Sequence, residues 1–106
     1  MRPANQQQAI RHMEHLLKRK LKGNRQTRVN EHMKRSNRIA AAIWGRFQVG
    51  PYQYQLKHIR WYMEVYTKYL APNTRYRHWL TIRSITQALN KNAEWIILLE
   101  RSRWGF

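Results

Sequence analysis

The chain has 106 residues, with 21 lysines and arginines against five acidic residues, and its formal net charge is +16. A charge this large repels itself in a folded molecule and favours an anionic partner, with nucleic acid as the first candidate, an anionic membrane as the second and an acidic protein as the third. The absence of cysteine excludes disulfides and thiolate metal sites, and no apolar run is long enough to span a membrane or to serve as a secretory signal. We therefore expect a cytoplasmic protein, in the cytosol or nucleoid of a bacterial host.

The first predicted helix covers residues 4–22, where apolar side chains recur at helical spacing. These are Ile10, Met13, Leu17 and Leu21. Gly23-Asn24 is expected to end this helix, and the polar, basic stretch 23–30 is typical of a linker. The sequence thus predicts a basic helical arm and linker over 1–28, which precede a nucleic-acid-binding domain over 29–106.

Two helices are expected in the first half of that domain. One covers about 31–46, with Asn30 as its cap, and ends before a turn at Gly50-Pro51. The other covers roughly 52–70, where apolar residues follow 3-4-3-4 spacing. They are Leu56, Ile59, Met63, Tyr66 and Leu70. This regular spacing predicts one continuous helix up to Pro72.

The fourth predicted helix begins at about 72–74, ends near 89 and has two distinct faces. One face is apolar and carries Trp79, Ile82, Ile85 and Leu89. A second stripe carries Tyr76, Leu80, Arg83 and Gln87, with Arg77 beside it. The residues 90–92 end this helix, and a short fifth helix is expected around Trp95. No strand pattern appears, so we expect an all-α protein: a small bundle of about four helices preceded by the basic arm.

Residues 62–89 resemble the core-binding (SAM-like) domain of tyrosine recombinases, the phage-integrase family. In that family a helix ends in Leu, a Ser-Pro-x-Thr segment opens the next helix, and an aromatic and apolar ladder follows. The matching positions are Leu70, Pro72, Asn73, Thr74, Tyr76, Leu80 and Ile82. Ala71 replaces the family's capping serine, so the cap is expected from Asn73 or Thr74. The resemblance implies a helical domain that clamps one face of duplex DNA, and it implies binding without strand cleavage because the family's catalytic domain has no counterpart here.

Two groups of residues are candidates for contacting nucleic acid. The first is the cationic run of the arm: Lys18, Arg19, Lys20, Lys22, Arg25 and Arg28. The second is the opening of the fourth helix and its polar stripe: Arg75, Tyr76, Arg77 and Arg83. Arginine forks match phosphate oxygens, and backbone contacts of this kind position a protein on a duplex. The alternatives are a solubilising tail for the first group and a solvated helix face for the second.

The aromatic residues and histidines suggest no catalytic or metal site. Trp44, Trp79 and Trp95 are expected in the core, whereas Trp61 and Trp104 lie off the apolar faces and are candidate contacts. His12 and His15 have a spacing compatible with a metal ion but no paired third ligand. The other histidines form no nuclease motif, so we expect no cofactor, no metal and no enzymatic activity.

Taken together, these features favour a non-enzymatic DNA-binding accessory or regulatory protein of a phage or mobile element, which resembles a stand-alone recombinase core-binding domain. Its expected partner is nucleic acid, duplex DNA rather than RNA, within a larger protein–nucleic acid complex and without a membrane. Two alternatives stay open. The first is an RNA-binding subunit of a ribonucleoprotein, and the second is a basic inhibitor that docks on an acidic groove of a host enzyme.

Overall fold

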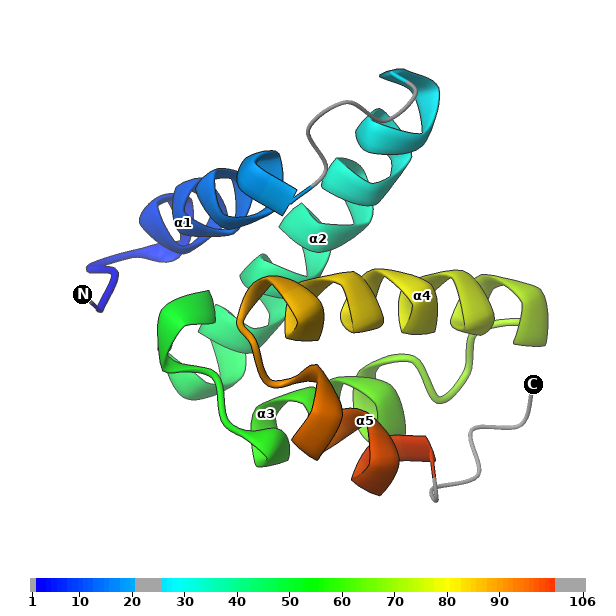
Figure 1. Ribbon diagram of the computed structural model, residues 1–106. Coiled ribbons are helices and arrows are strands. Elements are labelled where there is room, and N and C mark those ends of the chain that lie inside the picture. The colour runs from blue at the N-terminus through cyan, green and yellow to red at the C-terminus, as the bar shows by residue number, and fades with distance from the viewer. Residues whose placement is uncertain (1, 21–25, 101–106) are drawn as a thin grey trace.

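The computed structural model describes residues 2–20 and 26–100, and in these ranges the chain forms helices and no strands. The elements are α1 (Gln6–Lys20), α2 (Gln26–Phe47), the 3-10 turn η1 (Pro51–Gln53), α3 (Leu56–Trp61), the π-helical turn η2 (Tyr62–Tyr66), α4 (Pro72–Ala88) and α5 (Asn92–Glu100). Figure 1 shows α4 running across the middle of the molecule, with α1 and most of α2 on one side and α3 and α5 on the other. The predicted all-α class, a small helical bundle, is confirmed.

One core joins all five α-helices. Its fully buried members include Met13, Leu17, Ile39, Ile43, Ile59, Tyr62, Met63, Ile82, Ile85 and Leu99. Each such side chain contributes about 1.5–3 kcal/mol relative to an exposed position. Trp79, Ile82 and Ile85 of α4 are buried as their spacing predicted, and Trp95 is buried too, while Trp44 and Leu89 are only half-buried.

Helix α1 is part of this core. Ala9, Met13, Leu16 and Leu17 are buried, and the helix packs on α2 and α4. The arm expected over 1–28 is therefore, over 6–20, a packed element of the bundle. The physical reason is the apolar stripe itself, because an amphipathic helix is stabilised mainly by burying that stripe.

Helix α2 begins earlier than the sequence predicted. Residues 26–30, assigned above to the linker, are its first turn and a half, so Asn30 is not a cap. None of these residues is a glycine or proline, and the breakers Gly23-Asn24 lie before them. The helix ends where Gln48 takes a positive φ of 54° and its amide donates to the Trp44 carbonyl over 2.8 Å.

The prediction of one continuous helix over 52–70 is wrong. The segment divides into η1, α3 and η2, and the amide of Thr67 donates to the carbonyl of Tyr62 over 3.1 Å, the i→i+5 bond of a π turn. A π turn contains one residue more than an α-helical turn. The side chains after it are therefore rotated about the helix axis, away from the buried face that carries Ile59. Tyr66 and Leu70 are consequently exposed, and Tyr62 is buried in the core.

The ends of α4 are set by proline at one end and asparagine at the other. Ala71 is the N-cap without a side-chain hydrogen bond, and Pro72 follows, so the expected cap from Asn73 or Thr74 is wrong. At the other end Asn90 adopts φ 60°, and the Lys91 amide donates to the Thr86 carbonyl over 2.9 Å. This αL ending stops the helix where 90–92 was expected to stop it.

The first described residues are held against the turn that follows α2. Pro3 is buried, and a Cβ atom added at Gly50 would lie 2.6 Å from Pro3 Cγ. Arg2 Nε donates to the Gln48 carbonyl over 3.1 Å. Glycine at position 50 is therefore required by space, since its φ of −99° is open to any residue.

Candidate nucleic-acid interface

The crossing of α2 and α4 is organised around the hydroxyl of Thr81, which is fully buried. Arg35 Nε of α2 donates to Thr81 Oγ1 over 2.9 Å, and His32 Nδ1 lies 3.1 Å from the same oxygen. The hydroxyl in turn donates to the Arg77 carbonyl of its own helix over 3.3 Å. One threonine therefore fixes two basic side chains of α2 on the side of α4 that α2 covers.

Positive charge is concentrated at this crossing. Burial lowers the pKa of Arg35, Arg77 lowers it further, and Glu31 acts in the opposite direction. Burial also lowers the pKa of His78, and so do the nearby charges of Arg35 and Arg38. Because these cations repel one another across a partly desolvated site, an anion bound among them would relieve the repulsion.

Arg83 lies further along α4 and has an unsatisfied donor. Its Nε is buried and has no hydrogen-bond partner, and the side chain lines a hollow of about 250 Å³. The other lining residues are His32, Leu80, Ser84 and Gln87. A buried donor without an acceptor costs about 1–3 kcal/mol, and an incoming oxygen atom can satisfy it only if the Arg83 side chain moves to expose it.

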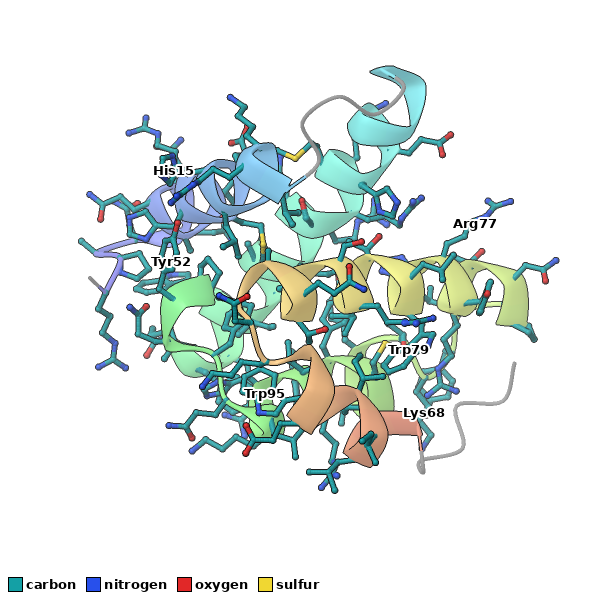
Figure 2. The ribbon with its side chains drawn as sticks, in the orientation of Figure 1. His15, Tyr52, Lys68, Arg77, Trp79 and Trp95 are labelled. Atoms are coloured by element: carbon teal, nitrogen blue, oxygen red, sulfur yellow. The ribbon has the colours of Figure 1, made fainter. Side chains whose placement is uncertain are left out.

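A second hollow continues the first one toward α1. It has a volume of about 380 Å³ and is lined by Leu16, Arg19, Gln87, Ala88 and Asn90. Gln87 lines both hollows, so they adjoin on the side of α4 that faces α1 and α2. We define the α4 groove as Arg19, His32, Arg83 and Gln87, which line these hollows, and we place Arg35 and Arg77 beside it at the crossing of α2 and α4. Figure 2 shows the Arg77 side chain extending from α4 on the side where α1 and α2 lie.

Two of the sequence-predicted contact residues, Arg19 and Arg83, line adjoining hollows, while Arg77 lies close enough to Arg35 to lower its pKa. Lys18 and Tyr76 are exposed on α1 and α4. Lys22 and Arg25, and the side chains of Lys20 and Arg28, lie outside the described residues. Of the second stripe predicted on α4, Leu80, Arg83 and Gln87 line one hollow, and Tyr76 is not among its lining residues.

Arg75 has a different environment. Its Nε donates to Thr67 Oγ1 over 3.1 Å, and Nη2 donates to the Met63 carbonyl over 2.8 Å. Both acceptors belong to the end of the preceding helical segment, so this guanidinium joins that segment to α4. Its role in the described structure is to hold the fold together.

His32, Arg35 and Arg38 were missed by the sequence reasoning. They belong to the stretch 31–38, "EHMKRSNR", in which four of eight residues are Lys, Arg or His. The local density of cations was a usable signal. The closeness of Arg35 to Arg77 could not be found from the sequence, because it depends on how α2 crosses α4.

The rings of Trp61 and His12, two further candidates from the sequence, pack against other aromatic rings of the protein. Trp61 is half-buried with its ring edge-on to Phe47 at 5.5 Å, and Trp104 lies outside the described residues. The His12 ring packs on Tyr52 at 5.9 Å. In the part of the chain that the structure describes, no three His, Asp or Glu side chains gather as metal ligands would.

No family model, curated protein or solved structure matches the chain. Within 2–20 and 26–100, none of the helices has both the length and the apolar character needed to cross a membrane.

Proposed function

We propose that this chain is a non-enzymatic DNA-binding protein that holds the sugar-phosphate backbone of a duplex in the α4 groove. The observation that carries the proposal is the set of basic side chains that line two adjoining hollows, Arg83 and His32 in one and Arg19 in the other. A phosphate oxygen is the acceptor that such a guanidinium fits best, because charge-assisted hydrogen bonds to phosphate are short and strong.

The shape of the groove supports an extended anion. Arg77 and Arg83 are six residues apart, so they are separated by about 9 Å along the axis of α4 and by about 120° around it. Arg19 and Arg35 add cations from two other helices. Cations that come from three helices can contact several phosphates and so position a protein on a duplex.

The biological role that we propose rests on the resemblance of residues 62–89 to recombinase core-binding domains. That resemblance favours duplex DNA over RNA and suggests an accessory or regulatory role in a phage or mobile element. The proposed role is binding without catalysis. The groove offers the cationic donors of its arginines and the ring of His32, and the hydrogen bond between Tyr62 and His78 is buried in the core at 2.9 Å.

The test is the salt dependence of binding to a short blunt duplex, measured by fluorescence anisotropy. With several phosphates neutralised, affinity should fall by about 10³-fold or more between about 50 and about 200 mM salt. Arg83→Ala should weaken binding, whereas Lys57→Ala, which removes an exposed charge from α3, should not. Equal loss in the two variants would mean that the net charge of the protein, and not the groove, attracts DNA.

Competition experiments with the bound duplex distinguish DNA from structured RNA and from an acidic protein as the partner. Structured RNA that displaces the duplex at equal salt would establish the ribonucleoprotein alternative. Retention on an acidic protein, with no retention on either nucleic acid at low salt, would establish the inhibitor alternative and remove the proposal.

A further inference from the structure

The turn between α3 and α4 concentrates exposed apolar side chains. Eight large hydrophobic residues are exposed in the described part of the chain, and four of them lie between positions 65 and 70. They are Val65, Tyr66, Tyr69 and Leu70, with Tyr69 89% exposed. Single exposed apolar residues are ordinary, but a cluster of this kind marks a contact surface.

This surface is rigid. The Thr67 hydroxyl donates to the Met63 carbonyl over 2.6 Å, and Arg75 of α4 donates to both residues. The Leu70 amide donates to the Thr67 carbonyl over 3.0 Å, which closes the turn. The side chains at 66 and 69 therefore project from a fixed backbone, and little ordering is needed when a ligand binds.

The aromatic rings are arranged as the start of a stack. Tyr66 lies on the buried ring of Tyr62 with centroids 4.8 Å apart and planes 16° apart, and 43% of Tyr66 remains exposed. The ammonium of Lys68 lies 5.6 Å from the centroid of the Tyr69 ring. Glu64, the acid of this segment, faces Arg60 at 3.8 Å. Rings beside a cation suit a ligand that has both flat bases and phosphates.

We propose that Tyr66 and Tyr69 stack on unpaired nucleobases while Lys68 contacts the adjoining phosphate, so that the protein favours DNA with a single-stranded extension over a blunt duplex. This inference rests on the proposed function, because it takes the ligand to be nucleic acid. In Figure 2 Arg77 extends on the side of α4 where α1 and α2 lie, and Lys68 lies on the side of α5, so a strand that contacts both passes around the first turns of α4. Base–aromatic stacking tolerates any sequence, because every base has a flat face.

The experiment measures affinity for four probes: a blunt duplex, the same duplex with a short single-stranded extension, the same duplex with an extension of abasic sugars, and the base-bearing single strand alone. The abasic extension keeps the phosphates and removes the bases. The parent protein should bind the base-bearing extension more tightly than the abasic one by about tenfold for each stacked base.

Tyr69→Ala and Tyr66→Ala should each lower this preference by about tenfold, and Tyr69→Phe should keep it because the ring is retained. The matched control is Tyr52→Ala, which removes a tyrosine of 45% exposure from η1 and should leave the preference unchanged. Tyr69 is almost fully exposed, so its substitution leaves the fold intact, which circular dichroism verifies.

The outcomes separate the two proposals. Absence of blunt-duplex binding overturns the proposed function, while preference for bases over abasic sugars still supports the stacking site. Equal affinity for base-bearing and abasic extensions overturns the stacking site, whatever the duplex does. A preference that is unchanged in Tyr69→Ala and in Tyr66→Ala overturns it as well, and leaves these side chains as a surface for an apolar protein partner.

Discussion

Arg75 Nε donates a hydrogen bond to Thr67 Oγ1 over 3.1 Å, across the turn that separates the π segment from α4. The same guanidinium reaches the Met63 carbonyl, which also accepts the hydroxyl of Thr67. An arginine that stands in a cationic run of the sequence is thus part of the internal hydrogen bonding of the fold.

The first prediction concerns this arginine. Arg75→Ala should lower the free energy of unfolding by roughly 1.5–3 kcal/mol, because hydrogen bonds from a charged donor are lost. Arg77→Ala, two residues away and exposed, should change it by less than about 0.5 kcal/mol. Urea unfolding followed by circular dichroism measures both. Equal stability of the two variants would show that the Arg75 contacts contribute nothing.

The second prediction concerns the number of phosphate contacts. Each of the single variants Arg77→Ala and Arg83→Ala should make the slope of log affinity against log salt shallower by about one unit, since each removes one phosphate contact. Neither should change sequence preference. Anisotropy titrations at several salt concentrations give the slopes, and an unchanged slope would remove the residue concerned from the interface.

The third prediction separates position from charge. Thr81→Val keeps the size of the side chain but removes the hydroxyl that fixes Arg35 and His32. DNA affinity should fall several-fold while the salt slope stays the same, because the cations remain but lose their fixed positions. Stability should fall by about 1–3 kcal/mol, because the half-buried Nε of Arg35 loses its acceptor. Thr81→Ser, which retains the hydroxyl, should restore the affinity, and failure of this rescue would contradict the positioning role.

The fourth prediction concerns α1. Leu17→Ala should lower the free energy of unfolding by about 2–5 kcal/mol, because Leu17 is fully buried. Removing residues 1–20 should unfold the domain by exposing the surfaces of α2 and α4 that α1 covers. Thermal unfolding measures both. A folded truncated protein would mean that α1 is dispensable, as an independent arm would be.

The fifth prediction concerns pH. Burial lowers the pKa of both His58 and His78, with added repulsion from Lys57 for the first and from Arg35 and Arg38 for the second. His58 Nδ1 accepts the Gln55 amide over 2.9 Å, a bond that only the unprotonated nitrogen makes. The unfolded chain therefore binds more protons than the folded chain below about pH 6.5, and stability should decrease as pH falls from about 7 to about 5.

Urea unfolding across this pH range is the measurement for the fifth prediction. His78→Gln should reduce the pH dependence, since it removes one titrating group and leaves a polar side chain near Tyr62. A stability that is flat between neutral and mildly acid pH would contradict the assignment of both histidines as neutral groups.

The sequence predicted the helical content and the buried face of α4 because both depend on local spacing. Trp79, Ile82 and Ile85 recur at helical intervals and are buried together. The π turn was not predictable in the same way, since the 3-4-3-4 pattern up to Leu70 is equally regular in a continuous helix. The local geometry is decided by tertiary contacts, namely the burial of Tyr62 and the hydrogen bonds from Arg75.

The candidate site was only partly predictable for a similar reason. Arg77 and Arg83 were found from their place on a polar stripe, and Arg19 from its place in a cationic run. Their assembly with Arg35 and His32 depends on the crossing of α2 over α4 at Thr81, which spacing along one helix does not encode. Charge density identified the partner class that we propose, and the contacts between helices identified where that partner would bind.

The contact between Pro3 and Gly50 has an evolutionary consequence. A Cβ atom at position 50 would lie 2.6 and 2.7 Å from two ring atoms of Pro3, so neither position is free to accept substitutions independently of the other. Among descendants of this chain, a side chain at position 50 should be found together with a smaller residue at position 3. These two positions, 47 apart along the chain, should therefore covary.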